Sequence, residues 1–155
     1  IFMLGDDALN KQYRAILSFN TATLPDTAII QSATIKIMEG GTPKGANPFA
    51  ALGSLRVDIR KPYFGTTAAL QLPDFNTEPS AAAVGTFGKS PSAGWYSAAL
   101  NAAGLTNINK TGSTQLRLYF SLDDNNNHAA DYKQFFSGNA IAANRPVLSI
   151  VYSLP

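Results

Sequence analysis

One short segment holds most of the side chains that could do chemistry: Asp123-Asp124-Asn125-Asn126-Asn127-His128-Ala129-Ala130-Asp131. It contains three of the ten carboxylates, three asparagines and the only histidine of the chain. Carboxylate and amide oxygens are the ligands that Ca²⁺ prefers. The same side chains also build polar turns, because they bond to the backbone of nearby residues. The segment therefore predicts either a calcium site or a polar turn between two strands.

The expected metal ligands follow the alternating spacing of oxygen donors in a calcium loop: Asp123, Asn125, Asn127 and Asp131. The segment is not an EF-hand, because His128 stands where that motif needs glycine and Gln134 where it needs glutamate. Asp6 or Asp7 could join the site from the other end of the chain. In the alternative, the loop bonds to itself and Arg145 bridges to Asp131, since crowded carboxylates repel one another unless a cation offsets them.

Catalysis has little support in these residues. A single histidine excludes a zinc site built on two or three histidines within one chain. No Gly-x-Ser-x-Gly sequence is present for a serine nucleophile. A carboxylate pair for glycoside hydrolysis could be formed by Asp58 with Asp74 or Glu78, but nothing favours it. We therefore expect a protein that is not an enzyme, with His128 in a turn that faces solvent.

Aromatic side chains suggest a binding surface for sugars, because the C–H face of a pyranose ring stacks on an aromatic ring. The expected ligand-binding residues are Tyr63, Tyr96, Arg117, Tyr119 and Tyr132. Trp95 and Tyr96 are neighbours on one predicted strand and must point to opposite faces, so we expect Trp95 in the core and Tyr96 on the surface. Arg117 and Tyr119 share a face that we expect to be exposed. They could recognise hydroxyls or a uronate, or the tyrosine could simply pack over the arginine.

Composition narrows the classes of partner. The 155 residues suffice for one domain with a full core. Charged residues make up 14% of the chain, the net charge is +2, and the lysines and arginines are scattered, which argues against nucleic-acid binding. No apolar run approaches the roughly 18 to 20 residues that span a bilayer, so we expect no membrane insertion. The polar, cysteine-free composition is compatible with export, and we expect an extracellular or cell-surface module cut from a longer secreted protein.

The dominant hydrophobic period is two, which predicts β-strands. Strands are expected over residues 12–19, 28–38, 55–60, 84–87, 95–100, 115–122, 132–136 and 147–152. Turn-forming residues separate them, and no amphipathic helix does, although a single helical turn could lie within residues 66–72. Short strands without intervening helices predict antiparallel pairing. The expected fold is therefore an all-β, jelly-roll-like, two-sheet antiparallel β-sandwich that forms a single domain over residues 1–155.

One predicted strand carries a row of alternating charges on its outer face. Arg56, Asp58 and Arg60 are spaced two apart, opposite the apolar Leu55, Val57 and Ile59. Opposite charges on one face of a strand usually neutralise each other. We therefore expect mutual pairing within the row, with a row that grips a ligand as the alternative.

Three stretches of the chain together resemble a known family. They are Arg14-Ala15-Ile16-Leu17-Ser18-Phe19 with Leu24-Pro25 and the run from Ile30 to Ile37, then Phe136-Ser137, then Arg145-Pro146 with the run from Val147 to Tyr152. This order resembles the DNRLRE family of disaggregatase-related modules, which is similar to carbohydrate-binding modules of secreted microbial proteins. The resemblance extends from about Tyr13 to Tyr152 and rests largely on strand residues.

The resemblance implies a jelly-roll sandwich, an extracellular setting, frequent Ca²⁺ binding and attachment to polysaccharide or cell-surface glycan. The chain departs from the family at Gly138-Asn139, where a basic residue and glutamate are common. It also departs upstream of Asp6, where only Ile1 to Leu4 remain, so the module is expected either to lack its first strand or to borrow one from another chain. We expect a non-catalytic carbohydrate-binding module with a calcium-supported loop. The alternative is an adhesive spacer or fibre subunit that contacts proteins through an open sheet edge and exchanges a strand with a neighbouring chain.

Overall fold

The chain folds into ten β-strands, described over residues 1–155 by a computed structural model. The strands are β1 (Phe2–Asp6), β2 (Gln12–Tyr13), β3 (Ala15–Asn20), β4 (Ile29–Met38), β5 (Leu55–Arg60), β6 (Ala81–Thr86), β7 (Trp95–Ala99), β8 (Ser113–Phe120), β9 (Asp131–Phe135) and β10 (Val147–Ser153). Short helical segments lie between some of them: α1 (Pro48–Ala51), the 3₁₀ turns η1 (Leu72–Phe75) and η2 (Ala142–Asn144), and α2 (Ala102–Thr106).

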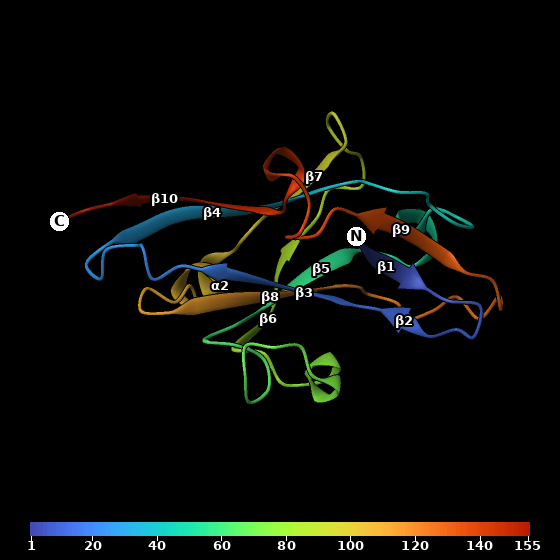
Figure 1. Ribbon diagram of the computed structural model, residues 1–155, viewed down its shortest axis with the longest axis horizontal. Helices are drawn as coiled ribbons and strands as arrows, with labels where there is room; N and C mark the ends of the chain where they lie inside the picture. The colour runs from blue at the N-terminus through green and yellow to red at the C-terminus, as the bar shows by residue number, and fades with distance from the viewer.

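The strands form two layers (Figure 1). One layer is the four-stranded sheet β3-β8-β5-β6 and the other is β10-β4-β7, while the sheet β2-β1-β9 lies across one end and its strand β2 runs on into β3. The last two sheets are joined where β9 meets the end of β4, because the N–H of Phe136 donates to the carbonyl of Met38 at 3.0 Å. All pairings are antiparallel, so the fold is an antiparallel β-sandwich.

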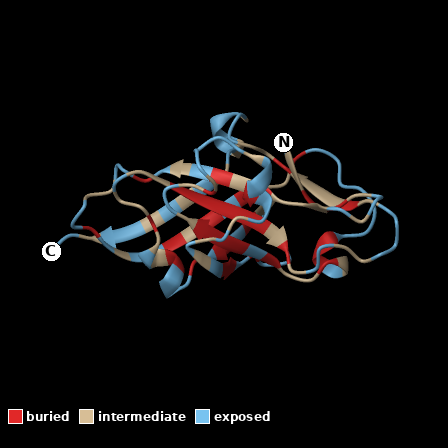
Figure 2. Cartoon of the chain, turned by 90° about the horizontal axis from the view of Figure 1, so that it is seen from below, coloured by how far each residue is buried: buried red, intermediate tan, exposed pale blue.

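The core lies between the layers, where strand side chains alternate inward and outward. Ala33, Ile35 and Ile37 of β4 are buried, and they face Leu116, Leu118 and other buried residues of the opposite sheet. Figure 2 shows this buried centre with exposed chain at both ends. The short helices begin at asparagine caps: Asn47 accepts from the N–H of Phe49, and Asn101 accepts from the N–H of Gly104.

The all-β antiparallel sandwich expected from the sequence is confirmed, and it forms a single domain. Every predicted strand overlaps an observed one, but the first is interrupted at Arg14, where the chain passes from β2 in one sheet to β3 in another. The helical turn expected within residues 66–72 lies instead at Leu72–Phe75. Ile1 to Leu4 do supply a strand, because β1 pairs with β9 along its whole length.

Candidate functional site

The polar loop between β8 and β9 is organised around the buried carboxylate of Asp131. Its Oδ2 accepts hydrogen bonds from the side-chain amides of Asn125 at 2.7 Å and Asn127 at 2.9 Å. Its Oδ1 accepts from the backbone N–H of Ala46 at 2.6 Å. Burial alone would raise the pKa of the Asp131 carboxyl, but these three hydrogen bonds outweigh it and hold that pKa below the ordinary value.

A second buried carboxylate lies beside it, as the sequence suggested for the start of the chain. Asp6 pairs with Asp131 across β1 and β9, and its Oδ1 accepts from the backbone N–H of Asp131 at 3.2 Å. Its Oδ2 is buried and has no hydrogen-bond partner. Burial raises the pKa of the Asp6 carboxyl, and the charges of Asp131 and Asp124 raise it further, against the lowering effect of backbone N–H groups.

The contacts within the loop fit a self-bonded polar turn. The amide groups of Asn125 and Asn127 point their N–H bonds at Asp131, while their oxygens accept from the backbone N–H groups of Asn127 and Ala129. Asp123 is exposed and lies outside this network. The expected bridge from Arg145 is wrong, because the Arg145 Nε donates to the carbonyl of Ala140 at 2.7 Å. His128 is exposed, as expected.

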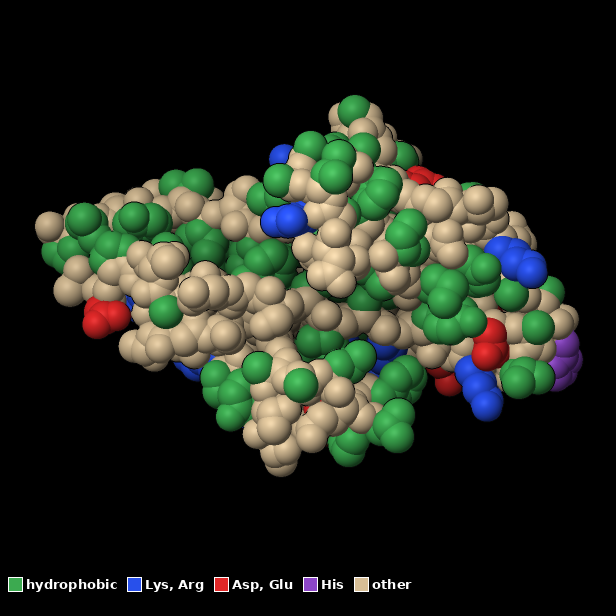
Figure 3. Space-filling model, viewed as in Figure 1, with side chains coloured by type: hydrophobic (Ala, Val, Ile, Leu, Met, Phe, Trp, Pro, Cys, Tyr) green, Lys and Arg blue, Asp and Glu red, His purple; other side chains and the backbone are tan.

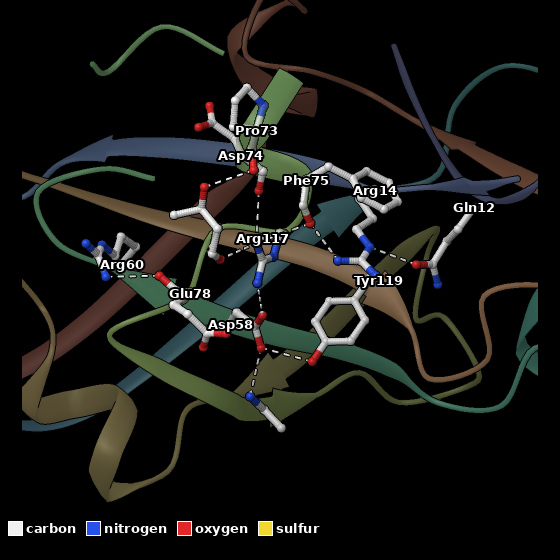
Figure 4. A network of polar contacts seen from close by, with 12 residues as sticks. Gln12, Arg14, Asp58, Arg60, Pro73, Asp74, Phe75, Glu78, Arg117 and Tyr119 are labelled. Carbon is white, nitrogen blue, oxygen red and sulfur yellow. Dashed lines mark hydrogen bonds and ion pairs between the residues drawn. The ribbon is translucent and has the colours of Figure 1, made fainter. Parts of the chain in front are cut away.

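A second polar network occupies the outer face of the four-stranded sheet (Figure 4). The guanidinium of Arg117 donates to Asp58 at 2.6 Å, and both side chains are almost fully buried. Asp58 also accepts from the Tyr119 hydroxyl at 2.9 Å and from the backbone N–H of Ala83 at 2.9 Å. The expectation of an exposed Arg117 is therefore wrong, because the loop of residues 61–80 covers this face.

Arg117 fastens that covering loop to the sheet. Its Nη1 donates to the carbonyls of Asp74 at 2.9 Å and Thr77 at 2.7 Å, and its guanidinium lies 4.6 Å from the ring centroid of the buried Phe64. The row Arg56-Asp58-Arg60 does not pair within itself, contrary to the expectation. Asp58 pairs with Arg117, and Arg60 donates to the carbonyl of Glu78 at 2.9 Å.

The two adjacent aromatics on β7 point opposite to the expected directions. Tyr96 is only 2% exposed and stacks on the ring of Phe49 with centroids 4.8 Å apart, so it belongs to the core. Trp95 is half-buried on the outer face. The signal was present in the sequence, because Ala98 and Leu100 share the face of Tyr96 whereas Ser97 shares the face of Trp95.

The outer face of the β10-β4-β7 sheet forms a shallow hollow of about 530 Å³. Trp95 lines it beside exposed polar side chains, Lys36 and Ser97, which lie opposite each other on β4 and β7. Ser149 of β10 and Ser92 of the preceding turn complete the polar rim. Lys36 forms no ion pair, since the two ion pairs of the chain are Arg117–Asp58 and Lys133–Glu39. The hollow thus combines an aromatic face, hydroxyl groups and a free ammonium group.

The other three tyrosines expected to bind a ligand, Tyr63, Tyr119 and Tyr132, do not line this hollow. Tyr132 is half-buried on β9 and makes an edge contact with Tyr13 at 5.8 Å. Tyr63 is half-buried in the loop that follows β5. Tyr119 is half-buried, and burial followed by the negative charge of Asp58 raises the pKa of its hydroxyl. The five expected ligand-binding residues are therefore not gathered into one site.

The fold and the hollow define a β-sandwich module with a polar, tryptophan-containing sheet face. No family model, curated protein or solved structure matches the chain. The resemblance to DNRLRE modules therefore stays a prediction. None of the helices is long and apolar enough to cross a bilayer.

Proposed function

We propose that this protein is a non-catalytic, extracellular or cell-surface module that binds polysaccharide on the outer face of β10-β4-β7. The observation that carries the proposal is the half-buried indole of Trp95 on a sheet face whose neighbours are hydroxyls and an amine. An aromatic ring provides the stacking surface for a sugar ring, and the surrounding polar groups bond its hydroxyls. Tyr96 and Arg117 have no part in this proposal, because both are buried.

The unpaired Lys36 favours an acidic glycan. Its ammonium group is exposed in the hollow, forms no ion pair, and is flanked on the neighbouring strands by Ser97 and Val147. A carboxylate on a sugar ring stacked against Trp95 could form a charge-assisted hydrogen bond with it. The proposed ligand class is therefore a polysaccharide that contains uronate residues.

Replacing Trp95 by alanine is expected to weaken polysaccharide binding by more than about tenfold, because a partly buried tryptophan dominates this kind of contact. The measurement is affinity gel electrophoresis with polygalacturonate as the acidic polymer and hydroxyethyl cellulose as the neutral one. Lys36→Ala should weaken binding to polygalacturonate and leave the neutral polymer unaffected.

Tyr152→Ala provides the matched control, since it removes an exposed aromatic outside the hollow. It should retain full binding. Unchanged retardation of the Trp95→Ala variant, or no retardation of the original protein by either polymer, would contradict the proposal.

We also propose that a Ca²⁺ ion supports the polar loop. The support for this is the buried Asp6 Oδ2, an acceptor without a donor beside the Asp131 carboxylate. Coordination through Asn125 and Asn127 would require both amides to turn their oxygens inward, because their N–H groups now face Asp131. The ion would stabilise the loop and take no part in chemistry.

Addition of CaCl₂ is expected to raise the melting temperature relative to the protein in EDTA. At a free concentration of about 100 times Kd the ion would add about 2.7 kcal/mol, or roughly 5 to 10 °C for a domain of this length. Asp6→Asn should remove the shift, whereas Asp26→Asn, at an exposed position, should keep it. Identical melting curves in CaCl₂ and EDTA would mean that the loop binds no Ca²⁺ and is stabilised by its own hydrogen bonds alone.

A further inference from the structure

The sheets β3-β8-β5-β6 and β10-β4-β7 each have one covered edge and one open edge. On β6 the carbonyl of Val84 accepts from the N–H of Asn101 at 2.7 Å, and on β7 the carbonyl of Ser97 accepts from the N–H of Gly88 at 3.1 Å. These bonds cover one side of the sandwich. The strands at the opposite edges of the same sheets are β3 and β10. Uncovered edge strands are templates for pairing with another chain.

The main chain of β3 has free donors and acceptors along this edge. Next to the ladder between β3 and β8, the N–H of Thr21 donates to the carbonyl of Gly112 at 3.2 Å. Residues that bond across an antiparallel pair alternate along the strand. Ala15, Leu17 and Phe19 therefore bond to β8, whereas the N–H and C=O groups of Ile16 and Ser18 point outward. Neither residue makes any other main-chain hydrogen bond.

A hollow of about 430 Å³ runs along this edge. One wall is β3 from Arg14 to Phe19, and the other contains Gly138 and Arg145. Leu70, which is 79% exposed, lines it together with Ile16 and also lines the adjoining hollow beside η1. Hydrophobic side chains are visible along the seam between the two layers in Figure 3. The edge is therefore bordered by apolar surface that a packed strand could cover.

Two arginines in this hollow have no carboxylate partner. Arg14 donates through Nε to Gln12 at 2.7 Å and through Nη1 to the carbonyl of Phe75 at 2.6 Å. Arg145 is exposed, and its one hydrogen bond is the Nε contact with the carbonyl of Ala140. Neither takes part in an ion pair. The charge of the hollow thus complements a segment that carries carboxylates.

We propose that the open edge of β3 binds an extended, acidic segment of a partner protein, which adds to the sheet as a further strand. The main-chain groups of Ile16 and Ser18 would pair with it, its apolar side chains would enter the hollow, and its carboxylates would reach Arg14 and Arg145. A second copy joined through β3 would bring no carboxylate to either arginine, because β3 contains none. This site is separate from the sugar-binding face.

The test uses ¹⁵N-labelled protein and the peptide acetyl-Val-Glu-Val-Thr-Val-Glu-Val-amide as the probe. The expected result is saturable binding with slowed hydrogen exchange at the amides of Ile16 and Ser18. Two N-methylated peptides serve as controls, one methylated on the valines and one on the residues between them. Only the peptide methylated on the residues whose N–H groups face β3 should lose binding, because the N–H groups of the other residues face solvent.

Protein variants test the two parts of the site separately. Ser18→Pro removes one outward N–H group and should abolish peptide binding, whereas Ser18→Ala keeps that group and should bind normally. Proline is tolerated at such positions of an edge strand. Near-ultraviolet circular dichroism checks that both variants are folded. Arg145→Glu should lower the affinity of the protein for the acidic peptide by about tenfold. The same variant should gain affinity for a peptide with lysine in place of glutamate.

Two results would overturn the proposal. The first is binding that is absent, or that is equally lost with both N-methylated peptides. The second is concentration-dependent dimerisation of the protein alone, measured by analytical ultracentrifugation, with protection of the Ile16 and Ser18 amides in the dimer. That outcome would assign the edge to a second copy of the chain.

Discussion

Asp58→Ala is expected to lower the free energy of unfolding by about 3 to 5 kcal/mol, because it leaves the guanidinium of Arg117 buried without its counter-charge. The same change removes the acceptor for the Tyr119 hydroxyl and for the N–H of Ala83. Ala83 has a positive φ of 49° and lies where the pairing of β5 with β6 shifts register. We therefore expect the β6 edge and the loop of residues 61–80 to loosen together, which urea denaturation and amide exchange would measure.

Glu39→Ala is the matched control, since it breaks the only other ion pair of the chain. The pair Lys133–Glu39 has side chains that are 13% and 27% exposed, against 6% and 4% for Arg117–Asp58. Pairs exposed to solvent typically contribute about 0.2 to 1 kcal/mol, so we expect this more accessible pair to contribute less than Arg117–Asp58. Equal losses for the two variants would mean that the buried network adds nothing beyond an ordinary surface pair.

Gly5→Ala is expected to lower the free energy of unfolding by about 3 kcal/mol or more. Gly5 has a φ of 139°, which side-chain-bearing residues rarely adopt. A methyl group there would also collide with the Asp131 carbonyl and would lie 2.7 Å from the Tyr132 Cα. Both obstacles belong to the backbone of β9, so a rotamer change cannot relieve them. Thermal unfolding followed by circular dichroism would give the loss.

Gly138→Ala controls for the general effect of adding a methyl group to a glycine. No atom lies within 4 Å of a Cβ at that position, and its φ is not in the positive range. The variant should unfold at the same temperature as the original protein or slightly above it. If Gly5→Ala proved equally harmless, β1 could not pair with β9 in the way described.

The strands were predictable because the apolar residues of their inward faces recur at every second position. Ala33, Ile35 and Ile37 alternate with polar residues, and all three are buried as expected. The crossing at Arg14 was not predictable, since the alternation continues through it without a turn residue. The pairing of β1 with β9 was also hidden, because strand order across a long stretch of sequence depends on the whole topology rather than on any local pattern.

The polar sites were harder to predict for a physical reason. Asp58 and Arg117 look like surface charges on the outer faces of strands, and only the covering loop makes them a buried pair. That loop has no periodicity from which its position could be inferred. The orientation of the β7 aromatics was predictable, because Ala98 and Leu100 alternate in phase with Tyr96 and not with Trp95. The polar loop was located correctly, and the identity of its stabilising partner, amides or a calcium ion, is what the chelation experiment decides.

The pairing of β1 with β9 also bears on how fast the domain forms. Phe2 lies opposite Phe135, so one sheet closes only when segments from nearly opposite ends of this sequence meet. Domains dominated by such distant contacts fold slowly, on a scale of about milliseconds to seconds. During synthesis β1 emerges long before its partner exists, and its apolar residues remain exposed meanwhile. Pulsed hydrogen-exchange labelling during refolding should therefore show β1 among the last elements to gain protection.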